Sequence, residues 1–97
     1  MPRRCRDSSV SESWSLDPER LDDALRRWRN EHPGPASRRH LEEFLMDLVE
    51  DPFGCGEEDG ETGNFTGFAG SDLQRIVIVY VPVLELRRVF VADIRFT

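Results

Sequence analysis

The sequence contains no lysine, and all 13 of its basic residues are arginine. Without lysine the chain cannot form the phosphate-binding motif G-x-x-x-x-G-K-[ST], although glycines are frequent between Gly54 and Gly70. Those glycines do not form G-x-G-x-x-G between a strand and a helix, and no G-x-S-x-G is present. The motifs of P-loop nucleotide binding, dinucleotide binding and α/β-hydrolase catalysis are therefore all missing.

Cysteine and histidine are scarce, with two of each. Cys5 and Cys55 make no disulfide framework, so we expect free thiols in a reducing compartment. Neither cysteine combines with His32 or His40 at a zinc-binding spacing, so we predict no metal and no cofactor. The basic start is not followed by an apolar stretch, and no apolar run approaches the roughly 20 residues that span a bilayer. We expect a cytoplasmic protein without a membrane partner.

The charge is unevenly distributed around a net value of −6. Residues 41–63 carry nine acids and no arginine. A net negative chain argues against general affinity for nucleic acid, because phosphate contacts need a positive footprint. The acids of residues 57–61 do not match the calcium-binding loop, in which Cys55 and Thr66 would have to serve as ligands. A glycine-rich, solvated acidic loop is expected instead.

Ninety-seven residues predict one domain. Residues 1–13 are polar, and we expect a disordered tail there, followed by one domain over residues 14–97. Residues 14–16 could be a short strand or the approach to a helix. Two helical patterns follow, each with an apolar stripe at helical spacing. The first begins at Asp17-Pro18, the second is capped by Ser37, and Asp51-Pro52 ends the second. The short Pro/Gly turn between them predicts an antiparallel helical hairpin.

Two β-prone runs, residues 73–81 and 86–96, form the last quarter of the chain. The first is so continuously apolar that we expect a central strand buried on both faces. The second alternates, which places Phe90 and Ile94 on one face and Val89 and Val91 on the other. We expect one core that contains Leu45, Leu48, Ile78 and Phe90. A weaker strand is expected around residues 65–68, broken by glycines. The predicted fold is α+β, with helices packed on one face of a small, mostly antiparallel sheet.

The arginines of the predicted strands are the best candidates for chemistry. Arg75, Arg87 and Arg95 would form a basic patch if the sheet curls, and arginine suits bidentate recognition of phosphate or carboxylate. Capping of the sheet edges, with pairing to acids such as Glu85 or Asp93, is the structural alternative. Tyr80 lies within a buried run and is expected to be structural.

A further set of residues carries a family resemblance over about residues 14–97. These are Leu45, Leu48, Asp51-Pro52 and Gly54 at the end of the second helix, Phe65 to Gly70 before the sheet, Arg75-Ile76 through Tyr80 in the central strand, and Val89, Val91, Ile94 and Arg95 in the last strand. The pattern resembles the RelE/ParE superfamily, the small toxins of type II toxin–antitoxin pairs. The resemblance implies a short first strand, a helical hairpin and a curled antiparallel sheet.

The same resemblance implies a toxin-like protein bound by a cognate antitoxin, with ribosome-bound mRNA or DNA gyrase as its target. It carries over only Arg75 and Arg95 as catalytic residues, which would bind phosphate and stabilise the transition state. The chain lacks lysine, has no histidine after His40, and lacks the usual Gly-Asp-Tyr-Arg turn. Ribonuclease activity is therefore predicted to be weak or lost, and whether the protein is an enzyme stays open. The alternative is a non-catalytic interaction module, immunity-like or accessory, that binds through an acidic face.

Overall fold

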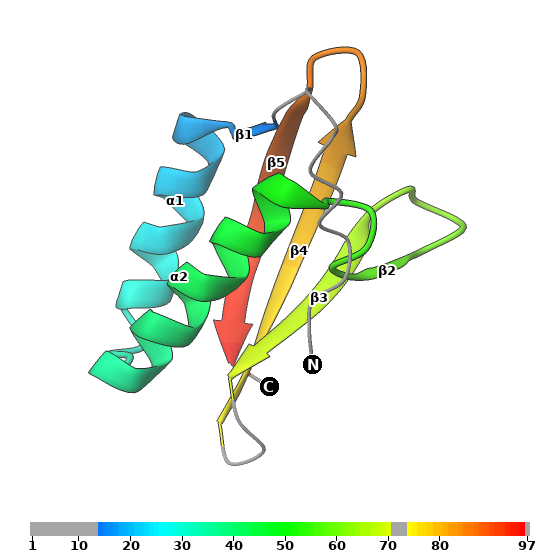
Figure 1. The fold of residues 1–97 in the computed structure, drawn as a ribbon. Coiled ribbons are helices and arrows are strands. Elements are labelled where there is room, and N and C mark those ends of the chain that lie inside the picture. Colours follow the sequence, from blue (N-terminus) through cyan, green and yellow to red (C-terminus); the bar gives the residue numbers. More distant parts are fainter. Residues whose placement is uncertain (1–13, 71–73, 97) are drawn as a thin grey trace.

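The computed structural model describes residues 14–70 and 74–96. The tail predicted over residues 1–13, with Cys5, lies outside the described residues. The elements are β1 (Ser15–Leu16), α1 (Pro18–Arg29), α2 (Pro35–Glu50), β2 (Glu57–Glu58), β3 (Phe65–Gly70), β4 (Arg75–Val83) and β5 (Arg88–Phe96). They form two layers, a helical hairpin and a sheet (Figure 1). This is the α+β architecture that the sequence predicts.

Helix α1 begins as its sequence indicates. The Asp17 side chain accepts a hydrogen bond from the backbone N–H of Arg20 at 3.0 Å, and Pro18 occupies the first turn. Ala24 and Trp28 are buried, one helical turn apart, and Leu21 and Leu25 pack beside them. The helix ends at Arg29, just before His32 adopts a left-handed φ of 57°.

Helix α2 begins earlier than predicted. Its N-cap is Gly34, with Pro35 in the first turn, so the prediction of Ser37 as the cap is wrong. Ser37 lies inside the helix, where it is buried and donates its hydroxyl to the side-chain oxygen of Gln74 at 3.0 Å. This bond joins the start of α2 to the residue before β4. The predicted end is confirmed, because the helix stops at Glu50, immediately before Asp51-Pro52.

The five strands form one mixed sheet in the order β1-β5-β4-β3-β2. Strand β1 pairs in parallel with the start of β5, and the other pairs are antiparallel. The central position predicted for β4 is confirmed, since β3 and β5 flank it along most of its length.

The region between α2 and β4 is more regular than predicted. Strand β3 continues through Gly67, which was expected to break it, and the missing side chain leaves room for the ring of Phe44. The acidic loop contains a short strand, β2, that pairs with the start of β3. Asp59 closes this hairpin, because its side chain accepts hydrogen bonds from the Glu61 N–H and the Thr62 hydroxyl, at 3.0 and 3.1 Å.

Strand β5 departs from simple alternation at a β-bulge. Tyr80 pairs with Val91 and Val79 pairs with Asp93, so Ala92 is an extra residue in β5. The bulge lets Val91 and Ile94 both face the core, although an unbroken strand would place them on opposite faces. The predicted separation of Val89 and Val91 from Ile94 is therefore wrong.

One hydrophobic core lies between the hairpin and the sheet. Its buried residues are Ala24, Trp28, Leu41, Phe44, Leu48, Phe65, Ile76, Ile78, Tyr80, Val89, Val91 and Ile94. Leu45, Leu48 and Ile78 take the core positions expected of them, Leu45 being only partly buried. Phe90 is half-buried and lies outside this cluster, so the prediction that it belongs to the core is wrong. The bulge places Phe90 and Ile94 on opposite faces of the sheet. None of the helices in the described part of the chain has the length and apolar character needed to cross a membrane.

Candidate functional site

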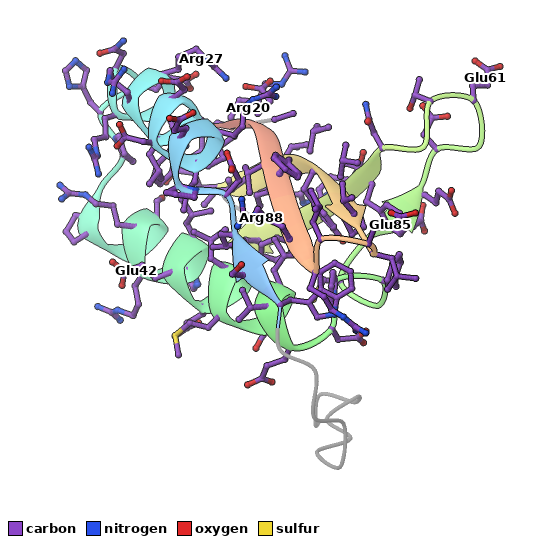
Figure 2. All side chains as sticks on the ribbon, turned by 90° about the horizontal axis from the view of Figure 1, so that it is seen from above. Arg20, Arg27, Glu42, Glu61, Glu85 and Arg88 are labelled. Carbon is purple, nitrogen blue, oxygen red and sulfur yellow. The ribbon has the colours of Figure 1, made fainter. Side chains whose placement is uncertain are left out.

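One face of the sheet has no helix packed on it in the part of the chain that the structure describes. Ile76, Ile78 and Tyr80 of β4 are fully buried in the core, so the residues between them point to the opposite side. Both helices lie on the core side (Figure 2). We call the opposite side the uncovered face. Within the described residues its side chains are Glu57, Thr66, Phe68, Arg75, Val77, Val79, Val81, Val83, Arg88, Phe90, Asp93 and Arg95.

The uncovered face is largely apolar. Four valines alternate along β4 from Val77 to Val83, and each is half-buried by its neighbours on β3 and β5. The prediction that β4 is fully buried on both faces therefore holds for one face only. Phe68 is 55% exposed beside this row, and Leu84 and Leu86 are 57% and 58% exposed in the turn beyond it. An apolar strip thus runs along the strand from Phe68 to the β4–β5 turn.

Arg75 and Arg95, the two predicted site residues, lie at the same end of this strip. Val77 pairs with Arg95 on one side and with Phe68 on the other, and Arg75 is two residues before Val77 on the same face. The two arginines are therefore diagonal neighbours across β4 and β5. The guanidinium carbon of Arg75 lies 5.7 Å from the centre of the Phe68 ring, a cation–π arrangement.

Arg87 does not join this pair. It lies in the β4–β5 turn with a left-handed φ of 52°, before β5 begins at Arg88. Arg95 lies eight positions further along the chain, about 25 Å along an extended strand. The predicted patch of Arg75, Arg87 and Arg95 is therefore wrong in its Arg87 member.

The charge of Arg95 is partly balanced. Its Nε lies 3.2 Å from a carboxylate oxygen of Asp93, the other oxygen of which is 4.0 Å from Nη2 of Arg27. Nη2 of Arg27 also donates to the carbonyl of the bulge residue Ala92 at 3.0 Å. The structural alternative, in which an arginine of the strands caps the sheet edge and pairs with Asp93, thus describes Arg95. Within the described residues Arg75 has Phe68 and no carboxylate partner.

The uncovered face has little capacity for acid–base chemistry. Tyr80 points into the core, where its hydroxyl donates to the carbonyl of Pro52 at 2.9 Å. Burial, with smaller contributions from Cys55 and Asp51, raises the pKa of Tyr80 well above its usual range, so its hydroxyl stays protonated. His32 and His40 belong to the helix layer. On the uncovered face the arginines can hold an anion, and the other charged side chains are the carboxylates of Glu57 and Asp93.

The acidic hairpin lies at the edge of the sheet, where Glu57 pairs with Thr66 of β3 and Thr66 in turn pairs with Val79 of β4. Glu57, Glu58 and Glu61 are exposed, and their hairpin projects from the start of β3. In the part of the chain that the structure describes, no three histidine, cysteine or acidic side chains gather in a way that could hold a metal ion.

Sequence reasoning missed two features of this surface. One is the bulge at Ala92, which moves Phe90 to the uncovered face. The other is Arg27, which reaches from α1 to the edge of β5. No sequence pattern marks the bulge at Ala92, which lies between Val91 and Asp93, and none links residues 27 and 92.

Comparison of the chain with known proteins leaves its family open. No family model, no curated protein and no solved structure matches the chain.

Proposed function

We propose that this protein is a toxin-like component of a type II toxin–antitoxin pair, similar to the RelE/ParE toxins, and that a cognate antitoxin-like protein covers its apolar sheet face. The order of elements is the one that the resemblance implies, with a short strand, a helical hairpin and then the remaining strands. That order carries no information about activity by itself, because one fold supports many functions.

The uncovered face is the observation that carries the proposal. A row of half-buried valines with exposed Phe68 beside it is a large apolar surface for so small a domain. Protein interfaces are distinguished by an apolar, aromatic-containing core with arginine among the enriched residues. The uncovered face combines these features, with Arg75 and Arg95 at one end of the valine row. A partner segment laid along β4 would remove the strip from water.

Any RNA cleavage by this protein should be weak or absent. Arginine titrates far too high to exchange protons near neutral pH, and Tyr80 is held in the core with a raised pKa. Arg75 and Arg95 can still bind a phosphate and stabilise developing negative charge. Their loss should therefore remove residual activity without moving its pH optimum.

The activity is tested by cleavage of ribosome-bound mRNA and by gyrase supercoiling. We expect Arg75→Ala and Arg95→Ala to abolish whatever activity the wild-type chain shows, and Arg20→Ala, on the exposed surface of α1, to retain it. Robust cleavage that survives both strand substitutions would overturn the site assignment.

A non-catalytic interaction module is the second candidate, and the acidic hairpin favours it. Glu57, Glu58 and Glu61 are all exposed there, with no arginine from residue 41 to residue 63 to balance them. Growth after induced expression separates the two candidates. A toxin-like protein slows growth, and co-expression of the product of the adjoining gene restores it. An interaction module leaves growth unchanged and is inactive in both biochemical assays.

A further inference from the structure

Most of the charge on the uncovered face is balanced within the face. Among the described residues its charged side chains are Glu57, Arg75, Arg88, Asp93 and Arg95. Nη1 of Arg88 lies 3.8 Å from a carboxylate oxygen of Asp17, and Nε of Arg95 lies 3.2 Å from one of Asp93. Arg75 is the arginine of this face that has no carboxylate partner in the described part of the chain.

The two acids of the uncovered face lie away from Arg75. The strand register places Glu57 four residues and two strands from Arg75, about 16 Å between Cα atoms. It places Asp93 four residues and one strand away, about 14 Å. The acids of α1 and α2 belong to the helix layer, on the other side of the sheet (Figure 2). Asp72 lies outside the described residues and is tested below as a variant.

The surroundings of Arg75 are apolar. Its guanidinium carbon lies 5.7 Å from the centre of the Phe68 ring, and Val77 is the next residue of β4 on the same face. Phe68 is 55% exposed, so a bound partner can reach both the ring and the guanidinium. Apolar neighbours shield an ion pair from water and strengthen it relative to a fully exposed pair. A guanidinium can bind a carboxylate through two parallel hydrogen bonds.

We infer that the partner of the uncovered face is a mainly apolar protein segment with one Asp or Glu placed against Arg75 and Phe68. The inference rests on the proposed function, because it describes the partner proposed there. The valine row from Val77 to Val83 is about 20 Å long, and one unbalanced positive charge lies at its end. A complementary segment therefore needs apolar side chains along the row and a single carboxylate at one end.

A nucleic-acid strand matches this surface less well than a protein segment. A strand with one phosphate per about 3.4 Å would present about six charges along the valine row. The face offers one unbalanced arginine and a row of valines, which contribute nothing to phosphate binding. Aromatic and apolar side chains with an arginine among them are typical of the core of a protein interface.

The chemistry of the partner is tested with a displayed library of random peptides about 12 residues long, enough to follow the valine row as a helix or a strand. Selection on the full wild-type chain should enrich apolar peptides that contain Asp or Glu. Selection on Arg75→Gln should no longer enrich the acids. Enrichment of basic peptides, or of none, would overturn the inference. The growth assay uses no peptide, so the inference and the toxin-like function can fail separately.

A double-mutant cycle with the tightest selected peptide locates the carboxylate. By fluorescence anisotropy at about 50 mM salt, Arg75→Gln should weaken binding about fivefold, and so should replacing the acid of the peptide by its amide. The two changes together should cost no more than either alone. Arg88→Gln is the control, because it removes the same charge from the same face, and it should stay within about twofold of wild type. Additive losses in the cycle, or an equal loss from Arg88→Gln, would overturn the inference.

Three further measurements test the surroundings of Arg75. Phe68→Ser should weaken peptide binding by on the order of tenfold, whereas Met46→Ser, on the outer side of α2, should not. Asp72→Asn should stay within about twofold of wild type, and a gain of about fivefold or more would show that Asp72 already balances Arg75. Displacement of the peptide by an equal concentration of single-stranded DNA would overturn the choice of a protein partner.

Discussion

Gly67→Ala tests the closest contact between the helix layer and the sheet. Gly67 lies in β3, opposite Ile78 of β4, and the ring of Phe44 from α2 packs directly on it. A Cβ at position 67 would lie 2.5 and 2.8 Å from two ring carbons of Phe44 and 3.0 Å from the carbonyl oxygen of Cys55. The new methyl group therefore cannot be accommodated unless the ring moves.

The expected cost follows from two opposing effects. Overpacking a filled core costs about 1–3 kcal/mol, and Phe44 has little freedom because it is 8% exposed and lies against the Tyr80 ring. Replacing glycine by alanine within a strand recovers about 0.5–1 kcal/mol of chain entropy. We expect a net loss of about 1–2 kcal/mol in the free energy of unfolding. In a Phe44→Leu background the same substitution should be neutral or stabilising, since the two clashing atoms are gone.

Urea denaturation of the two single variants and the double variant closes this thermodynamic cycle. Gly60→Ala is the control, because a Cβ at position 60 has no atom within 4 Å, and it should stay within about 0.5 kcal/mol of wild type. A Gly67→Ala variant as stable as wild type, or a coupling energy with Phe44 near zero, would refute the packing of α2 on β3.

Three further predictions concern stability. Tyr80→Phe removes the hydrogen bond to Pro52 and should cost about 1–2 kcal/mol at neutral pH, measured in urea. Because the folded pKa of Tyr80 is raised, wild type should lose stability above about pH 10, and the variant should lose less. Replacing residues 57–61 by a Gly/Ser linker should cost less than about 1 kcal/mol, and strong amide-exchange protection there would contradict this. Ile78→Ala should cost about 2–5 kcal/mol but Val79→Ala only about 1 kcal/mol, and equal losses in thermal melts would contradict the one-sided burial of β4.

The local elements could be predicted because their signals are local. The Asp17 cap, the apolar stripes of the helices and the stop at Asp51-Pro52 each act within a few residues. The run from Ile76 to Val81 likewise predicts a central strand from its own composition. The α+β class followed from the order of these elements.

The errors arose where distant residues decide the outcome. From the sequence alone, Gly67 indicates a break in the strand. In the structure the strand continues, and the Phe44 ring occupies the space that a side chain at position 67 would fill. Strict alternation fails in β5 because the extra residue Ala92 has no partner on β4. The periodicity of the sequence does not reveal such an insertion. The two-sided burial predicted for β4 failed for a related reason, since valine suits a half-buried sheet surface as well as a fully buried one.

Residue type and strand position were enough to predict the pair of Arg75 and Arg95. The ion pairs of these arginines could not be predicted without the fold. Arg75 and Arg95 lie on one face because β4 and β5 are antiparallel neighbours in the observed register. The balancing of Arg95 by Asp93, and of Asp93 by Arg27, depends on where α1 lies against the edge of β5.

The central claim is that an antitoxin-like partner covers the uncovered face of a toxin-like protein. The most direct test measures growth of cells after induced expression, with and without the product of the adjoining gene, for wild type and two surface variants. Phe68→Ser changes the uncovered face, and Met46→Ser changes an apolar side chain of α2 that is 67% exposed. We predict that wild type slows growth, that the adjoining product restores it, and that Phe68→Ser weakens this rescue whereas Met46→Ser does not. Normal growth under wild-type induction, or rescue of Phe68→Ser as complete as that of wild type, would contradict the account.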